Sequence, residues 1–273
     1  MKARLLAALI WLVVLWCLAP FVWQIVTSLK TEAEIAHIPT VYLPGEPTLH
    51  HYAVLFERKP FARYLWNSFV ISSAATLVCL AVSALAAYSF ARLRVRGAKW
   101  IRLVLVAIAF FPPIIFFFPL YEMVRATHTA NTPLALIIPY ATFNLPFAIL
   151  VLSAFFRTIS SEIEDAAKVD GFSPIQILLK IILPLSAPAL ATTGILVFIF
   201  CWNEFLLALT FMTCDTARTV TAGIASLSGG TPYELPWGAI SASVVLSTLP
   251  LVALVMIFQR RIVQGLTAGA TKG

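Results

Sequence analysis

Six long apolar stretches divide this chain of 273 residues, and they constrain its fold more than any other feature. A helix needs about 20 predominantly apolar residues to cross the hydrocarbon core of a bilayer. The stretches that reach this length are 5–26, 66–90, 101–120, 134–156, 187–212 and 238–258. Because backbone polar groups in lipid must be satisfied within their own segment, each stretch should be a helix. The sequence therefore predicts an all-α membrane protein with six transmembrane helices.

Composition and charge support this class. Hydrophobic residues make up 60% of the chain and charged residues 11%, with a mean hydropathy of +0.92, which excludes an ordinary soluble domain. If both termini are cytoplasmic, thirteen of the nineteen Lys and Arg residues fall on the cytoplasmic side. The positive-inside rule favours that topology. The net charge of +7 is then a topological signal, with no nucleic-acid partner implied. The basic cluster at 92–99 is interpreted as a loop near anionic lipid.

The order of these segments predicts three regions. Residues 1–65 form an N-terminal transmembrane helix and an external loop, which either contacts an outside partner or is a solvated connector. Residues 66–260 form the transmembrane core, and residues 261–273 a cytoplasmic tail. The first stretch is expected to be retained as a span, since no small-x-small cleavage site follows it. Pro112 and Pro113 are expected to break the third span.

A polar segment at 161–171 interrupts this apolar pattern. Ser161 followed by Glu164 has the spacing of a capping box, which predicts a helix beginning there. Gly171 suits the left-handed position after the helix ends at Asp170. A second box, Ser173-Pro174-Ile175-Gln176, predicts another helix that ends before Pro184.

The composition of this polar helix favours a protein partner. Membrane-surface helices favour Lys and Arg on their polar face. This helix instead has several acidic residues and only one basic residue, Lys168. The alternative is an amphipathic helix lying on the membrane. Of the two, docking to a soluble protein is the better interpretation.

The spacing around this helix resembles a known motif. Asp165-Ala166-Ala167, Gly171 and then Ile181, Leu183 and Pro184 follow the EAA motif of permease subunits of bacterial ABC importers, with aspartate in place of the first glutamate. The resemblance implies the type I ABC importer permease fold with a cytoplasmic coupling helix at 161–171. The residues it implies in ATPase coupling are Glu164, Asp165, Ala166, Ala167, Lys168, Asp170, Gly171, Leu183 and Pro184.

Three other segments are similar to the maltose-permease-like carbohydrate group, and to trehalose-type and amino-sugar-type permeases within it. These are Asn67-Ser68, Trp202-Asn203-Glu204-Phe205 and the end from Gly265 to Ala270. The resemblance implies that the C-terminal residues Gly265, Leu266, Thr267 and Gly269 contact the ATPase. It also implies a second homologous permease and an extracytoplasmic solute-binding protein in a bacterial plasma membrane.

The chain itself contains no G-x-x-x-x-G-K-[ST] motif. Two separate ATPase subunits are therefore expected to bind ATP and Mg²⁺, so this chain needs no cofactor and carries no catalytic residue. No metal site is expected either, since the cysteines and histidines form no close-spaced ligand pattern.

Polar residues within the spans are candidates for the translocation path. Glu204 carries an acidic group in the fifth stretch, which should face a cavity or a partner or be protonated. Asn203 and Asn144 could bind sugar hydroxyls, as could Asn67, and Trp202 could stack on a sugar ring. For these asparagines and Glu204, hydrogen bonds between helices are the alternative.

Other function classes remain open. The solute could be a disaccharide such as trehalose, an oligosaccharide, an amino sugar or glycerol 3-phosphate. An ion-coupled secondary transporter would use Glu204 as proton carrier, but would leave the capped polar helix unexplained. A membrane-embedded enzyme would need a metal cluster or paired carboxylates within the spans, and the sequence shows neither.

Overall fold

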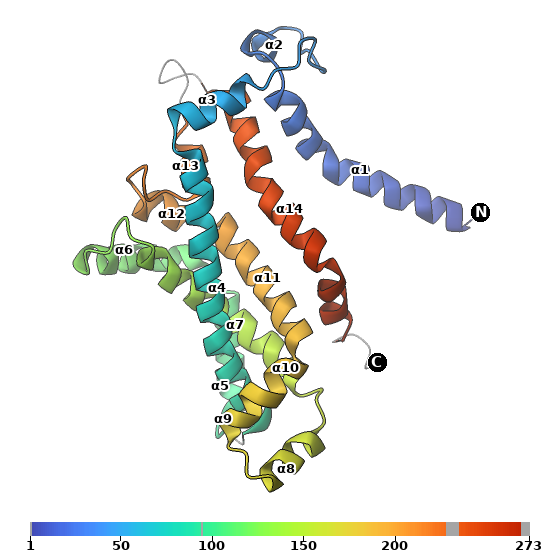
Figure 1. Ribbon diagram of the computed structural model, residues 1–273, viewed down its shortest axis with the longest axis vertical. Helices are drawn as coiled ribbons and strands as arrows, with labels where there is room; N and C mark the ends of the chain where they lie inside the picture. The colour runs from blue at the N-terminus through green and yellow to red at the C-terminus, as the bar shows by residue number, and fades with distance from the viewer. Residues whose placement is uncertain (1, 94, 228–234, 269–273) are drawn as a thin grey trace.

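The computed structural model describes residues 2–93, 95–227 and 235–268, and in these residues the chain is helical with no strand (Figure 1). The helices are α1 (Lys2–Ser28), α2 (Glu32–Ala36), α3 (His50–Arg58), α4 (Phe61–Arg92), α5 (Ala98–Ala109), η1 (Pro113–Phe116), α6 (Phe117–Ala126), α7 (Leu134–Phe156), α8 (Ser161–Val169), α9 (Pro174–Ile177), the π-helical η2 (Leu178–Ile182), α10 (Leu183–Leu185), α11 (Ala187–Asn203), α12 (Leu206–Phe211), α13 (Val220–Ala225) and α14 (Trp237–Ala268).

Among the described residues, four helices are long and apolar enough to cross a membrane as single elements: α1, α4, α7 and α14. They correspond to the first, second, fourth and sixth predicted spans. Two bent pairs of helices, α5 with η1–α6 and α9–α10 with α11, overlap the third and fifth predicted spans. If each pair counts as one span, the described part of the chain has up to six. Helix α14 continues through Ala268, past the predicted end of the sixth span at 258.

The predicted break in the third span, 101–120, is confirmed. Helix α5 ends at Ala109, and η1 and α6 leave at 89° to it. Pro112 and Pro113 lie at the break, as expected from the missing proline N–H groups.

The fifth predicted span, 187–212, is interrupted in the structure, which the sequence did not predict. Helix α11 ends at Asn203, the backbone is extended at Glu204, and α12 begins at Leu206. Before α11 the chain turns by 81° from the α9–α10 segment. The break leaves the first backbone N–H groups of α12 without partners inside the helix. The Glu204 carboxylate at the α11–α12 junction accepts hydrogen bonds from two of them.

Helices α4, α7 and α11 form the core of the bundle, with α14 packed on α11 (Figure 1). Fully buried side chains at the core include Leu136, Val197 and Ala208. Helix α1 leans away from the bundle and meets the outer end of α14. Its apolar residues, such as Trp11 and Trp16, are exposed and require lipid or another chain to cover them.

The segment between α1 and α4 is folded rather than extended. Lys30 is 2% exposed, and its Nζ donates to the carbonyl of Val41 at 2.6 Å. The Nε2 atom of His51 in α3 lies 2.8 Å from the carbonyl oxygen of Lys30. This segment lies at one end of the bundle and α8 at the other (Figure 1).

Candidate functional site

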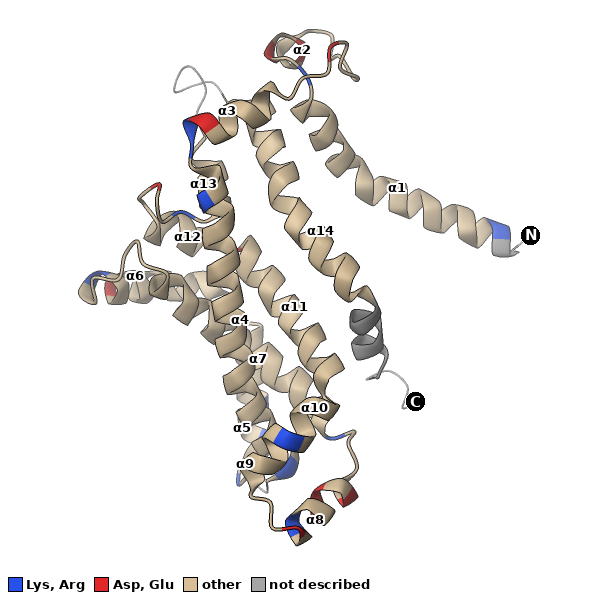
Figure 2. Ribbon diagram, in the orientation of Figure 1, with Lys and Arg blue, Asp and Glu red and all other residues tan. Residues whose placement is uncertain are grey.

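Helix α8 projects from the end of the bundle between α7 and α9, where basic and acidic residues gather (Figure 2). Its N-cap is Ser160, whose Oγ accepts a hydrogen bond from the N–H of Glu162 at 3.2 Å. The predicted N-cap, Ser161, is therefore wrong by one residue, and the predicted capping box of Ser161 with Glu164 does not form. Glu164 cannot complete a box because its side chain is buried against the bundle.

The C-terminal end of α8 confirms the predicted glycine signal. Gly171 has φ of +82°, in the left-handed region. Its N–H donates to Lys168 O at 3.1 Å, and the N–H of Phe172 donates to Ala167 O at 3.0 Å. This pair of bonds is a Schellman motif with Asp170 as C-cap, and it stops the helix sharply.

The second predicted helix begins as expected but does not end before Pro184. The N–H of Ser173 donates to Gln176 Oε1 at 2.8 Å in a capping box, with Pro174 in the first turn. The helical path then continues through η2 into α10. Pro184 lies in the first turn of α10, where the N–H that proline lacks is not required. Leu183 is half-buried in the apolar cluster beneath α8, and Pro184 is exposed.

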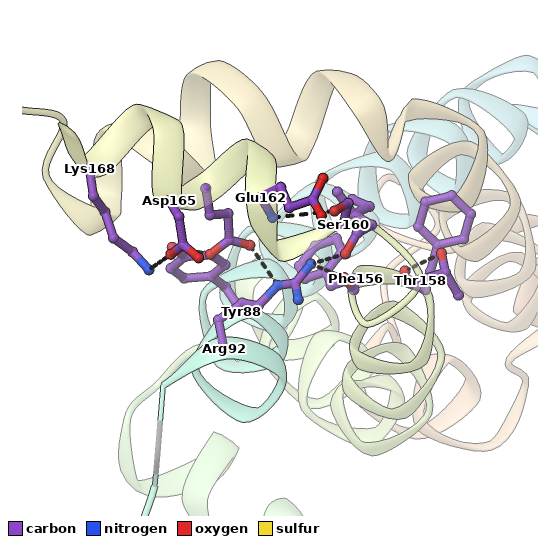
Figure 3. Close-up of polar contacts among 11 residues, drawn as sticks. Tyr88, Arg92, Phe156, Thr158, Ser160, Glu162, Asp165 and Lys168 are labelled. Carbon is purple, nitrogen blue, oxygen red and sulfur yellow. Dashed lines mark hydrogen bonds and ion pairs between the residues drawn. The ribbon is translucent and has the colours of Figure 1, made fainter. Parts of the chain in front are cut away.

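The inner face of α8 is held by one ion pair and one small residue. The Nε atom of Arg92, at the end of α4, lies 2.5 Å from Glu164 Oε1, and Tyr88 Oη lies 3.5 Å from Glu164 Oε2 (Figure 3). One turn later, Ala167 packs into the cluster that includes Ala87 and Phe156. Arg92 was predicted to belong to a basic loop near anionic lipid, but its side chain is instead largely buried in this ion pair.

The outer face of α8 is a different surface. Ile163, Ala166 and Val169 are exposed and follow one another at i, i+3 and i+6, so they form one stripe, called here the α8 stripe. Beside it, Lys168 Nζ and Asp165 Oδ1 form an exposed ion pair at 2.8 Å. Asp170 is exposed at the C-cap. Of the apolar residues predicted to share one face, only Ala167 turns inward.

An open cavity of about 450 Å³ lies beside the bundle, at the break between α5 and η1 and at the α11–α12 junction. Its walls are largely apolar, with several aromatic residues and few polar groups, as is usual for ligand pockets. Its lining includes Phe110, Tyr140, Phe143, Asn144, Phe147, Phe200 and Glu204. The aromatic residues were not predicted as site residues. For Phe110 and Phe200 the available signal was their nearness in sequence to Pro112–Pro113 and to Glu204.

Glu204 is the most constrained polar group of this cavity. Its Oε2 accepts from the Tyr140 hydroxyl at 2.6 Å and from the N–H of Ala208 at 3.1 Å. Its Oε1 accepts from the N–H of Leu207 at 2.9 Å. The carboxylate therefore satisfies two N-terminal donors of α12 and joins α12 to α7.

The other polar residues predicted for the path lie in separate places. Asn144 faces the cavity, with its Nδ2 donating to Tyr140 O at 2.8 Å. Asn203 is exposed and bonds back to Ile199 O in its own helix. Asn67 donates to the carbonyls of Thr216 and Arg218 and so holds the outer segment before α13.

Trp202 does not fit the expected stacking role. It is 3% exposed, and its ring stacks on Phe198 with 5.6 Å between centroids, in a core cluster outside the cavity. Of the predicted C-terminal contacts, Gly265, Leu266 and Thr267 belong to the last turns of α14, and Gly269 lies outside the described residues. Within the described residues, no group of three or more His, Cys, Asp or Glu could hold a metal ion.

Comparison with known proteins identifies the family to which this chain is similar. Residues 65–268 match the family described as the binding-protein-dependent transport system inner membrane component. The trehalose transport system permease protein of Mycobacterium tuberculosis is 41% identical over 100% of this chain and 98% of its own length. The sulfoquinovosyl glycerol transport system permease protein of Agrobacterium fabrum is also 41% identical, covering 94% and 89%. The trehalose/maltose transport system permease protein of Thermococcus litoralis is 40% identical, covering 94% and 92%.

The fold also matches solved structures. A chain from the crystal structure of a bacterial ABC transporter involved in the import of the acidic polysaccharide alginate aligns over 95% of both chains, with a TM-score of 0.79 and 21% identity. At this identity the match supports the fold alone.

Proposed function

This chain belongs to the family of binding-protein-dependent transport system inner membrane components, and we propose that it is the permease subunit of an ATP-driven importer that brings a sugar into the bacterial cytoplasm. The observation that supports coupling to an ATPase is the α8 stripe. It is a rigidly capped, exposed apolar surface at the end of the bundle opposite the α2–α3 segment. Such a helix suits a groove in a separate ATPase subunit.

The proposed complex contains a second homologous permease, two ATPase subunits that bind ATP and Mg²⁺, and an extracytoplasmic binding protein. The family description supports the binding protein. The second permease is supported by the exposed apolar length of α1, which little of this chain covers. In this arrangement both termini and α8 are cytoplasmic, and the chain has no catalytic role of its own.

A sugar is the proposed solute because the three relatives carry sugar-type solutes in their names and because the cavity suits one. Aromatic walls can contact the C–H faces of a sugar ring, while Asn144 and Glu204 can bind its hydroxyls. A disaccharide such as trehalose, an oligosaccharide or an amino sugar fits this chemistry. Glycerol 3-phosphate fits less well, since the Glu204 carboxylate would repel a phosphate.

An ion-coupled secondary transporter is the weaker alternative. Both carboxylate oxygens of Glu204 already accept hydrogen bonds, which opposes a role as mobile proton carrier. That alternative also gives α8 no purpose. Transport in proteoliposomes distinguishes the two: ATP should drive uptake, and a protonophore should leave the rate unchanged.

The test is reconstitution of the whole importer with its binding protein, ATPase and second permease. Trehalose, maltose, sulfoquinovosyl glycerol and an amino-sugar disaccharide would each be added with the binding protein, and ATP hydrolysis and uptake measured. Stimulation by at least one sugar is expected. Stimulation by an amino acid or peptide, and by no sugar, would overturn the carbohydrate assignment.

The docking surface is tested separately. Ile163→Asp places a charge in the α8 stripe, so the ATPase should no longer copurify with the permease. Leu43→Asp is the control, because Leu43 is also apolar and exposed but lies between α2 and α3, at the opposite end of the bundle. Retention of the ATPase by Ile163→Asp, or its loss in both variants, would contradict docking at α8.

A further inference from the structure

Arg92 joins three segments at the end of the bundle that carries α8. It is the last residue of α4, and its Nε contacts Glu164 of α8 at 2.5 Å. Its Nη2 donates to the carbonyl of Phe156, at the end of α7, at 2.8 Å and to that of Ile159, in the turn before α8, at 2.5 Å. One guanidinium thus holds α4, the end of α7 and α8 together (Figure 3).

This ion pair is nearly closed to solvent. The side chain of Arg92 is 13% exposed and that of Glu164 is 5% exposed. A buried charge left without its partner is strongly unfavourable, so the pair resists separation when α8 is pushed or pulled. A planar guanidinium can donate to a carboxylate and to carbonyls at once, which a point-like ammonium does less well. By contrast, the Asp165–Lys168 pair on the outer face is exposed and links only residues of α8.

We propose that Arg92 is a positioning residue for ATP coupling, which passes the displacement of α8 through Glu164 to the end of α4. The inference rests on the proposed docking of an ATPase on the α8 stripe. Helix α4 runs the length of the bundle and packs against both α7 and α11, which are two of the helices that line the cavity. A movement received at Arg92 therefore reaches the cavity walls as a movement of a packed helix.

The other attachment of α8, through Ala167, is apolar and small. It allows α8 to sit close to α4 but offers no directional bond that resists sliding. The Arg92–Glu164 pair is thus the directional link between the docking helix and the core. Loss of this link should separate ATP hydrolysis from transport without removing the ATPase from the complex.

The test measures sugar imported per ATP hydrolysed in proteoliposomes that contain the complete importer. Arg92→Gln and Glu164→Gln should each lower this ratio about fivefold or more, within the usual range of coupling between sites. Because both changes remove one interaction, the double variant should be no worse than the poorer single variant. Losses that multiply in the double variant would show independent roles and overturn the proposal.

Arg92→Lys keeps the charge and decides the outcome if the Gln variants do not assemble. It should give a smaller drop in the same ratio, and a wild-type ratio would overturn the proposal. Arg96→Gln is the matched control, since Arg96 is an exposed arginine in the turn after α4, and its ratio should be unchanged. A lower melting temperature with an unchanged ratio would mark a merely structural role.

Failure of the underlying function would look different. If the wild-type permease does not retain an ATPase at all, the docking proposal fails. If the ATPase is retained in every variant and the ratio never changes, docking stands and only the role of Arg92 is wrong.

Discussion

The hydroxyl of Tyr140 donates to the carboxylate of Glu204 across 2.6 Å, and this bond joins α7 to the junction of α11 and α12. The same carboxylate accepts the N–H groups of Leu207 and Ala208. Glu204 therefore stabilises the junction between α11 and α12, where the fifth span is interrupted. Its charge lies at a place where the helix has ended and donors are free.

Removal of the Tyr140 hydroxyl should weaken this junction. Hydrogen bonds to charged groups contribute about 1.5–3 kcal/mol, so Tyr140→Phe should lower the free energy of unfolding by an amount in that range. Glu204→Gln should cost at least as much, because it also weakens the bonds to α12. A double-mutant cycle on the purified complex, followed by thermal unfolding, checks this. Simple additivity of the two losses would contradict a direct bond.

Substitution of Gly171 should act through the backbone alone. A Cβ at this position meets nothing within 4 Å, but φ of +82° is costly for most residues. Gly171→Ala should therefore destabilise the end of α8 by about 1 kcal/mol, while Gly171→Asn, which tolerates this conformation, should cost less. Hydrogen exchange of the α8 amides measures the difference. Equal protection in Gly171→Ala and wild type would contradict the prediction.

The ends of α8 and α9 show what the sequence could predict. The Gly171 turn and the Ser173–Gln176 box depend on residues within a few positions of each other, so both were predicted from spacing and are confirmed. The start of α8 was wrong by one residue, because Ser160 and Ser161 are both good caps. The choice was decided by Glu164, which turns inward to Arg92.

Contacts between segments that are distant in the chain could not be predicted from the sequence. Arg92 and Glu164 belong to different helices, and nothing in the local pattern of either residue indicates the other. Glu204 was identified as requiring a cavity or a partner, and it has both, but Tyr140 could not be named. Trp202 was wrongly expected to face solute, because the sequence does not tell which side of a uniformly apolar helix faces the core.

The segment between α1 and α4 should respond to acid through Glu34. Its carboxylate accepts from the N–H of Thr31 at 3.0 Å and from that of Gly45 at 2.7 Å. The Thr31 bond first, and the Gly45 bond next, hold the pKa of Glu34 below its ordinary value of 4.5. A lowered folded pKa means that this stabilisation is complete above pH 4.5 and is lost as pH falls through the folded pKa.

Protection of the Gly45 amide, corrected for its intrinsic exchange rate, should therefore fall on acidification in wild type. In Glu34→Gln it should be lower at neutral pH and should change little on acidification. Glu57→Gln, at an exposed position in α3, is the control and should behave as wild type. Identical pH profiles for Glu34→Gln and wild type would show that Glu34 is not the titrating group.

Gly238, at the start of α14, should be intolerant of any side chain. A Cβ there would overlap the ring of His51, which is 2% exposed and bound to the Lys30 carbonyl. Gly238→Ala should displace this ring and lower the melting temperature, at a cost of about 1–3 kcal/mol for overpacking. Gly194→Ala in α11 is the control, since its nearest neighbour is the flexible end of Leu80 and a small shift accommodates it. Adding His51→Ala to Gly238→Ala should recover part of the loss, because the clash is gone. If the double variant is less stable than Gly238→Ala alone, the clash with His51 is not the cause.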